Sequence, residues 1–454
     1  MPNVVLIHTD DTGRHVGPYG HDVDTPALES LASDGVLFRN AFCAGPTCSP
    51  SRAALMTGQS PHESGMLGLA HRGFSLDAPE RHLATYLSER GVATVLSGQQ
   101  HEASEGDDPA REVLGYDRVL DGDESAVADR NLDGNRHTPT DIANATAAAS
   151  FLRHRDGDDP FFLSVGLYNT HQPMPLDQTT VDPDRVTPPA PLPDVEPVRR
   201  EMAAYQVLAQ YVDECVGTVL DGLAAGGHSD DTLVVFTTDH GLPLPRMKCD
   251  LRDGGIGVSL LARFPDGRRA GEAEDALVST MDLYPTVCEV LDRPVPAWTD
   301  APSLVPLTTG AADAVREQVF AEVTYHAAYE PKRCVRTPRY KYVRRFDEEY
   351  TREVGPNTDD GPSKRFLTDR GFLERRRPRE ALYDLVHDPN ERENLADDPT
   401  HRDIRASLAD RLRSWMARTA DPLLDGPVSK PDGASIDRRD NVDPGGEKEP
   451  ADAR

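Results

Sequence analysis

The chain has 454 residues, of which 37% are hydrophobic, and this is enough for a sizeable core. Such a length predicts one large domain with a smaller one. The 49 Lys and Arg residues against 77 Asp and Glu residues give a net charge of −28. This charge excludes nucleic-acid binding as a main role, because basic side chains drive that binding by releasing counterions. It also repels anionic lipid, and no run of 18 apolar residues predicts a membrane span.

Lysine is scarce, and arginine supplies most of the positive charge. An acidic, lysine-poor chain is typical of salt-loving organisms, where salt screens the self-repulsion; an acidic protein from a GC-rich genome is the alternative. The six cysteines are scattered without a CxxC pair, which argues against a zinc ribbon or a disulfide framework. The N-terminus, MPNVVLIHTDD, lacks the pattern of a signal peptide, so we expect a cytoplasmic protein with reduced thiols.

Strands and helices alternate along the first 265 residues. The apolar runs predict strands at 3–8, 92–96, 160–166, 232–238 and 258–264. Helical periodicity, with Pro or Gly at several segment ends, predicts helices at 26–34, 51–56, 81–90, 140–155 and 199–225. The proline-rich stretch 182–197 predicts a loop. This alternation predicts an α/β fold: a doubly wound, mostly parallel sheet flanked by helices.

The character of the chain changes after about residue 315. Residues 319–324 and 334–346 predict β-hairpin strands, and 402–418 predicts an amphipathic helix. The acidic, proline- and glycine-rich residues from 425 onward predict disorder. We therefore expect a catalytic α/β domain over 1–315, a smaller C-terminal α+β region over 316–424 and a disordered acidic tail over 425–454.

Two polar clusters follow predicted strands. Asp10-Asp11 ends the first strand, and Asp239-His240 ends the strand at 232–238. Ligands of doubly wound sheets bind at the carboxyl ends of strands, and adjacent carboxylates repel each other unless a cation lies between them. An acidic pair alone is more often a solvated turn, but the second cluster favours a site for a hard divalent cation such as Ca²⁺, with Mg²⁺ as the alternative.

The stretch Cys48-Ser49-Pro50-Ser51-Arg52 resembles the C-x-P-S-R signature of the type I sulfatases, within the alkaline phosphatase superfamily. The continuation through Gly58 is also similar to that family. The resemblance runs over most of residues 3–420, and several segments are most similar to the heparan N-sulfatase (sulfamidase) subfamily: 48–52, 65–69, 161–163, 239–245 and 380–395.

The resemblance implies a formylglycine- and metal-dependent sulfatase. In that family a modifying enzyme oxidises the cysteine, here Cys48, to formylglycine. The aldehyde hydrates, and one hydroxyl attacks sulfur; the second hydroxyl then expels sulfate. The resemblance makes Asp10, Asp11, Asp239 and His240 the metal ligands, with His240 as a variant of a common Asn. It also places the Arg52 guanidinium on the hydrated aldehyde.

The remaining catalytic candidates are one lysine and two histidines. Lys248 is the only lysine in the first 331 residues, and its compact ammonium suits a sulfate oxygen. Arg246 is a neighbouring alternative. By resemblance, His101 contacts the nucleophile, and His171 contacts sulfate or protonates the leaving group. A lone histidine is more often structural, but both of these follow predicted strands.

Gln99 stands where the family has a lysine, so the sulfate clamp loses one positive charge. Charge-assisted hydrogen bonds are about twice as strong as neutral ones, so we expect slow turnover, an unusual substrate or a site that high salt has remodelled. Together with Gln99, His71 and Arg72 are candidates for contact with substrate. His326 and Arg333 are weaker candidates, for which a surface position is expected.

The sequence therefore predicts a sulfatase that cleaves a sulfate ester or sulfamate, on a sugar or another small molecule, after a formylglycine-generating enzyme has modified Cys48. One alternative is a phosphonate or phosphate ester hydrolase of the same superfamily. Another is a non-catalytic protein that binds sulfated glycans, which the loss of charge at Gln99 favours. The sequence leaves the oligomeric state open.

Overall fold

The computed structural model describes residues 2–104, 106–125, 127, 135, 137–155, 157 and 159–450. The strands are β1 (Asn3–Thr9), β2 (Val36–Phe38), β3 (Ala41–Phe42), β4 (Ala93–Gly98), β5 (Arg118–Leu120), β6 (Phe161–Gly166), β7 (Thr232–Thr238), β8 (Leu260–Arg263), β9 (Glu272–Glu274), β10 (Val278–Ser279), β11 (Val319–Tyr325), β12 (Tyr329–Arg336), β13 (Tyr340–Arg345) and β14 (Glu380–Asp384). The α-helices are α1 (Pro26–Asp34), α2 (Cys48–Thr57), α3 (Pro61–Ser64), α4 (Leu83–Ser88), α5 (Pro109–Glu112), α6 (His137–His154), α7 (Glu196–Ala225), α8 (Asp253–Ile256), α9 (Leu283–Val290), α10 (Val305–Thr308), α11 (Pro362–Thr368) and α12 (Arg402–Arg418).

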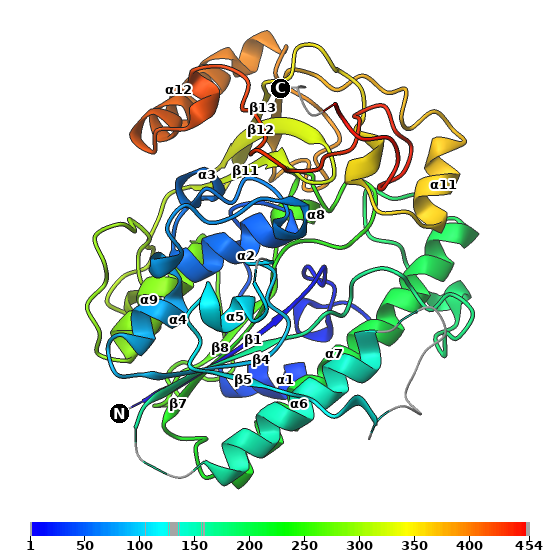
Figure 1. Cartoon of the computed structure of the whole chain (residues 1–454). Coiled ribbons are helices and arrows are strands. Elements are labelled where there is room, and N and C mark those ends of the chain that lie inside the picture. Colours follow the sequence, from blue (N-terminus) through cyan, green and yellow to red (C-terminus); the bar gives the residue numbers. More distant parts are fainter. Residues whose placement is uncertain are drawn as a thin grey trace.

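An eight-stranded sheet with the order β5-β4-β6-β1-β7-β8-β2-β9 forms the centre of the molecule (Figure 1). β1 lies between β6 and β7 and pairs with both in parallel, in a register that sets Thr9 beside Thr238. All seven residues of β1 are buried, because helices cover both faces of the sheet. The polar residues that follow β1 and β7 are therefore brought together at one edge.

Alternate residues of the central strands enter two separate cores. Val5 and Ile7 pack with α1, α6 and α7 on one face, whereas Val4 and Leu6 pack with α2, α4 and α9 on the other. The period of two in a strand produces this division. The predicted α/β fold with a mostly parallel sheet flanked by helices is confirmed. β8 is an exception, because it runs antiparallel to both β7 and β2.

A second, antiparallel sheet with the order β11-β12-β13-β14 follows in the chain, and α12 packs on it (Figure 1). Trp415 of α12 stacks on Phe320 of β11 with ring centroids 4.7 Å apart. The sequence analysis missed the first half of β12, because its polar residues mask the strand pattern. Lys332 and Arg333 are nevertheless buried there, each paired with carboxylates.

Several predicted element boundaries differ from the structure, and those of α2 and α4 are two examples. α2 begins at Cys48 itself rather than at residue 51. α4 spans only Leu83–Ser88, because the His82 side chain caps its start by accepting a hydrogen bond from the Ala84 amide.

None of the helices among the described residues is long and apolar enough to cross a membrane.

The C-terminal segment 425–450 packs against the body of the protein, so the disorder expected there is wrong for these residues. Ile436 and Asp437 are fully buried, and Ala434 joins the core that contains α2. Composition underestimated this segment because a single buried isoleucine and a few ion pairs anchor it. The boundaries drawn at 315 and 424 remain predictions.

Candidate active site

The ends of β1 and β7 build the centre of the site. The backbone amide of Asp11 donates a hydrogen bond to Oδ1 of Asp239 at 2.9 Å, and the Asp239 amide donates to the Thr9 carbonyl at 3.2 Å. Asp11 has a φ of 61°, a left-handed conformation that is uncommon outside glycine and turns the chain sharply at the strand end. The carboxylates of both segments are consequently buried in one cluster.

This cluster has the composition of a cation site. One donor atom from each of five buried residues lies within 4.8 Å of all the others: Asp10, Asp11, Cys48, Asp239 and His240. Within the described part of the chain, Asp10 Oδ1, Asp11 Oδ1 and Asp239 Oδ2 have no hydrogen-bond partner. Buried carboxylate oxygens without donors are costly, and a hard divalent cation satisfies them. The residues therefore fit the expected metal.

The imidazole of His240 is oriented for the same cation. Its Nδ1 lies 3.0 Å from the carbonyl oxygen of Gly241, to which it donates, so the lone pair is on Nε2. That nitrogen faces Asp11 Oδ1 at 3.3 Å and Asp239 Oδ2 at 3.6 Å. Burial lowers the pKa of His240 to about 3. A neutral ring with its lone pair toward two carboxylates is the arrangement of a metal ligand with a fixed tautomer.

The carboxylates differ in the ease with which they ionise. Burial and the neighbouring Asp10 raise the pKa of Asp239 well above its ordinary value, and burial raises the pKa of Asp11 to about 6. For Asp10, burial alone would raise the pKa, but the Arg52 guanidinium, together with a hydrogen bond to Asp239 and the nearby His171 and Lys248, holds it well below the ordinary range. In this structure the negative charge of the cluster is therefore only partly balanced by side chains.

Cys48 is the first residue of α2 and lies at the edge of this cluster. Its Sγ is 3.6 Å from Nε2 of His240, and the side chain is buried. Burial raises the pKa of the thiol well above its ordinary value. The hydroxyl of Ser51 donates to the Asp239 carbonyl at 2.5 Å and so fixes the first turn of the helix against the end of β7.

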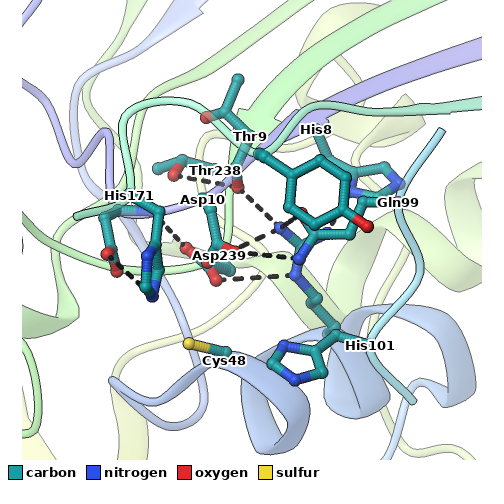
Figure 2. Close-up of polar contacts among 12 residues, drawn as sticks. His8, Thr9, Asp10, Cys48, Gln99, His101, His171, Thr238 and Asp239 are labelled. Carbon is teal, nitrogen blue, oxygen red and sulfur yellow. Dashed lines mark hydrogen bonds and ion pairs between the residues drawn. The ribbon is translucent and has the colours of Figure 1, made fainter. Parts of the chain in front are cut away.

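Arg52 connects α2 to the strand ends. Its Nε lies 3.5 Å from Asp239 Oδ2 and its Nη2 lies 3.7 Å from Asp10 Oδ1. Its Nη1 also contacts Nδ1 of His8 at 2.5 Å, a residue that the sequence analysis missed. Figure 2 shows His8 and Gln99 on one side of the Asp10 and Asp239 carboxylates and His171 on the other.

Lys248 bridges the carboxylates of Asp11 and Asp359. Its Nζ lies 3.0 Å from Asp11 Oδ2, 3.0 Å from Asp359 Oδ2 and 3.3 Å from Nε2 of His171. Burial alone would lower the lysine pKa, but the two carboxylates raise it well above its ordinary value. Asp359 lies 111 positions after Lys248 in an irregular loop, and no pattern in the sequence indicated it. Arg246, the alternative to Lys248, instead lies over the Phe372 ring, at 5.9 Å from its centroid.

Gln99 follows β4 and reaches the cluster from a third strand. Its amide donates to Asp10 Oδ2 at 3.1 Å, and its carbonyl oxygen lies 3.5 Å from Nη2 of Arg52. Gly166 at the end of β6 makes room for the backbone turn at Gln99, because a Cβ at position 166 would lie 1.9 Å from the backbone carbonyl oxygen of Gln99. Gln99 therefore bonds to the carboxylate cluster itself.

The rim candidates lie farther out. His71 is exposed on the 3-10 turn η2 (Ala70–Arg72), and its Nδ1 is 2.9 Å from Nε2 of His101. Arg72 pairs with Asp437 of the C-terminal segment at 3.3 Å. The surface positions expected for His326 and Arg333 are wrong. His326 is buried beside α2, with Nδ1 2.7 Å from the Thr47 hydroxyl.

Arg333 serves the fold away from the cluster. It is fully buried, and it pairs with Asp421 at 2.6 Å and with Glu322 at 2.7 Å. The exposure expected for it is wrong because two buried carboxylates compensate its charge.

Comparisons with known proteins agree with this geometry. The family model described as Sulfatase matches residues 2–292. Human N-sulphoglucosamine sulphohydrolase is 30% identical over 477 aligned residues, which cover 94% of this chain and 92% of that protein. Among solved structures, a 2-O GAG sulfatase is 24% identical with a TM-score of 0.72, over 95% of each chain. The phosphonate monoester hydrolase of Agrobacterium radiobacter is 23% identical with a TM-score of 0.72, over 95% of this chain and 100% of that one. The chain therefore belongs to the sulfatase family, a family of sulfuric ester hydrolases.

Proposed function

We propose that this protein hydrolyses a sulfate ester or sulfamate on a sugar, with a formylglycine made from Cys48 and a divalent cation. One observation carries the proposal: the Cys48 side chain lies within 4.8 Å of donor atoms from Asp10, Asp11, Asp239 and His240. These four residues would hold the cation, Ca²⁺ or Mg²⁺, which would supply positive charge to the sulfate oxygens and to the nucleophile.

The state of Cys48 supports the modification. A nucleophilic cysteine needs a depressed pKa, but burial raises the pKa of this thiol. An unmodified thiol at this position is therefore a weak nucleophile. Formylglycine would supply a hydrated aldehyde, an oxygen nucleophile whose reactivity does not depend on a thiolate. The signature around Cys48 is the one that a formylglycine-generating enzyme would recognise, so that enzyme is a proposed partner.

The charged side chains around the cluster support a division of roles. Arg52 adjoins Asp10 and Asp239 and is one helical turn from Cys48, so it would stabilise negative charge on the nucleophile. Lys248 is held protonated by two carboxylates and would bind a sulfate oxygen.

His171 lies beside Lys248 and is half-buried. Its Nδ1 donates to the Gln172 carbonyl at 2.7 Å, which directs Nε2 toward Lys248 at 3.3 Å. The lysine ammonium donates a hydrogen bond to that nitrogen, and His171 would contact the sulfate group or, in its protonated form, give a proton to the leaving oxygen or nitrogen. Gln99, His71 and Arg72 would contact or border the substrate.

The sugar substrate rests on the relatives. The human relative is named for N-sulphoglucosamine, and a relative from Bacteroides thetaiotaomicron, 26% identical over 470 residues, is named a Δ4,5-hexuronate-2-O-sulfatase. Both names describe sulfated sugars. A sulfamate and a sulfate ester differ only in the leaving atom, nitrogen or oxygen, and the same clamp on the sulfate group serves both.

The experiment is a desulfation screen on protein that is co-expressed with a formylglycine-generating enzyme. Mass spectrometry of the peptide containing Cys48 measures the conversion, and released sulfate is measured for N-sulfated and O-sulfated sugars and for an aryl sulfate. Cys48→Ala is the control. Fully converted protein that releases no sulfate from any substrate would contradict the proposal. A larger kcat/KM on an aryl phosphonate would instead favour a phosphonate hydrolase, and binding of sulfated sugar without turnover would favour a binding protein.

The net charge of −28 sets a condition of this screen. We propose that the protein works in a salt-rich cytoplasm, where counterions screen its surface. The screen is therefore run at low salt and at molar KCl, and higher activity and stability at molar KCl would support this setting.

A further inference from the structure

His71 and His101 form a hydrogen-bonded pair at the rim of the site. Nδ1 of His71 lies 2.9 Å from Nε2 of His101, the ring planes differ by 11° and the centroids are 5.2 Å apart. Rings stacked face to face cannot bring two atoms to 2.9 Å, which is the length of a nitrogen hydrogen bond. The rings therefore meet edge to edge in nearly one plane, with a single hydrogen atom between the two nitrogens.

Both imidazoles are neutral in this arrangement. Burial lowers the pKa of His101 to about 3, and the partial burial of the His71 ring together with the positive charge of Arg72 lowers the pKa of His71. A neutral imidazole has one N–H and one lone pair. Whichever ring donates in the pair therefore decides whether the second nitrogen of His101, Nδ1, is a donor or an acceptor.

The two ends of the pair lie in different surroundings. Nδ1 of His101 is buried and has no hydrogen-bond partner among the residues that the structure describes. Figure 2 shows the His101 ring on the same side of the Asp10 and Asp239 carboxylates as Cys48. His71, by contrast, is exposed on η2. The pair therefore extends from a buried nitrogen beside the site to the protein surface.

The C-terminal segment holds the outer ring in place. The Ser435 amide donates to the Arg72 carbonyl at 2.9 Å, and Asp437 pairs with the Arg72 guanidinium at 3.3 Å. Ala434 also packs against Gly73, the residue that ends η2. The C-terminal segment therefore anchors Arg72 and Gly73, the two residues that follow His71 in the chain. His71 has little freedom to leave His101.

We propose that His71 is a positioning residue that orients His101 and relays protons between its buried nitrogen and water. The proposal rests on the proposed function, in which His101 contacts the nucleophile. In the resting tautomer, His101 Nε2–H donates to His71 Nδ1, and the lone pair of His101 Nδ1 faces the pocket.

The relay conserves protons and charge. A hydroxyl in the pocket loses its proton to His101 Nδ1, the proton on His101 Nε2 moves to His71 Nδ1, and the proton on His71 Nε2 leaves to water. Both rings end neutral with their tautomers exchanged. The reverse sequence returns a proton from water to the pocket. We place this transfer in the step that releases sulfate, because that step needs a base beside the nucleophile.

The test compares His71→Phe, which abolishes the relay, with His71→Asn, whose side-chain oxygen can still accept the hydrogen bond from His101 but which cannot transfer a proton through a ring. His154→Phe is the matched control, since His154 is exposed and bonds to the Ser150 carbonyl in α6. We expect His71→Phe to lower kcat about tenfold or more with little change in KM. Leaving-group release should then show a burst that precedes sulfate release. Free imidazole should restore turnover in His71→Asn, whose shorter side chain leaves room for it, more than in His71→Phe, and His154→Phe should behave as wild type.

A wild-type kcat without a burst in His71→Phe would overturn the relay. Nitrogen NMR of the imidazoles provides a readout that does not depend on turnover, because ring nitrogen shifts report the tautomer. We expect the His101 nitrogens to shift in His71→Phe. If the wild-type protein releases no sulfate from any substrate, the proposed function fails, and unchanged His101 nitrogens would then refute the pairing independently.

Discussion

The side-chain amide of Gln99 donates a hydrogen bond to Oδ2 of Asp10 at 3.1 Å. This bond fixes the rotamer of a candidate metal ligand whose other oxygen, Oδ1, lacks a hydrogen-bond donor among the described residues. Groups that orient a ligand commonly change metal affinity by about 10- to 100-fold when they are removed. Gln99 therefore affects the cation site as well as the sulfate clamp.

We expect Gln99→Ala to weaken Ca²⁺ or Mg²⁺ affinity about tenfold, measured by calorimetric titration of protein stripped with a chelator. Gln318→Ala is the control, because Gln318 accepts a hydrogen bond from Arg411 at 3.1 Å, away from the site. An unchanged dissociation constant in Gln99→Ala would show that Asp10 is oriented without the amide.

The second prediction concerns Asp239, whose carboxylate lies in a buried cluster with Asp10 and Asp11. Without a cation, the three carboxylates repel one another, and with a cation they attract it. In excess chelator we therefore expect Asp239→Asn to melt at the same temperature as wild type or higher. At saturating Ca²⁺ or Mg²⁺ the order should reverse, because only the wild type gains the full binding energy. Scanning calorimetry in both conditions measures these melting temperatures. A wild-type melting temperature that neither Ca²⁺ nor Mg²⁺ changes would argue against a cation site in this cluster.

The third prediction concerns the ammonium of Lys248, which is buried between Asp11 and Asp359. Lys248→Met leaves two buried carboxylates without their partner, and removing one member of a buried pair costs about 3–5 kcal/mol of unfolding free energy. Adding Asp359→Asn removes one of the stranded charges, so we expect the double variant to recover part of that loss in chemical denaturation. Asp359→Asn alone completes the cycle, and a loss in the double variant equal to the sum of the two single losses would mean that the two residues are not coupled.

The fourth prediction is a pH dependence of stability. Burial alone would lower the pKa of His62, but the Glu322 carboxylate, 2.9 Å from Nδ1, outweighs burial and raises it. The folded pKa then exceeds the unfolded value of about 6.5. The stabilisation is fully present below that unfolded value, and it is lost as the pH rises through the folded pKa. We expect the unfolding free energy of wild type, relative to His62→Gln, to fall over that interval.

Urea denaturation from pH 5.5 upward, in steps across the region around the unfolded pKa of about 6.5, measures this difference. His154→Gln is the control, because its histidine is exposed on α6. A difference between wild type and His62→Gln that stays constant with pH would contradict the assignment.

The fifth prediction concerns the C-terminal segment. Ile436 is 1% exposed, so Ile436→Ala should lower the unfolding free energy by about 2–5 kcal/mol, whereas Val442→Ala, at a position that is 51% exposed, should have little effect. Deletion of residues 426–454 also removes the Asp437 partner of Arg72 at the rim. We expect this deletion to raise KM as well, and a fully stable and active truncated protein would show that the segment is dispensable.

The sequence by itself determined the fold class, the family and most of the cluster. Buried strands have an apolar pattern that ends abruptly at Asp10-Asp11 and Asp239-His240, and parallel strands place such ends together. The signature around Cys48 is contiguous, so it is visible without a structure. A contiguous motif and a periodic pattern are local properties, and local properties can be read from one chain.

Only the tertiary structure decided how charges are paired. Asp359 lies 111 positions after Lys248, with which it forms an ion pair, and His101 lies 30 positions after His71, to which it is hydrogen-bonded. No pattern in the sequence connects either pair. The burial of Arg333 in a strand could not be predicted either, because a charged side chain is expected to be exposed unless its buried ion-pair partners are known. Compensation between residues far apart in the chain depends on distances that only the folded chain fixes, and the same reason explains the packing of the C-terminal segment.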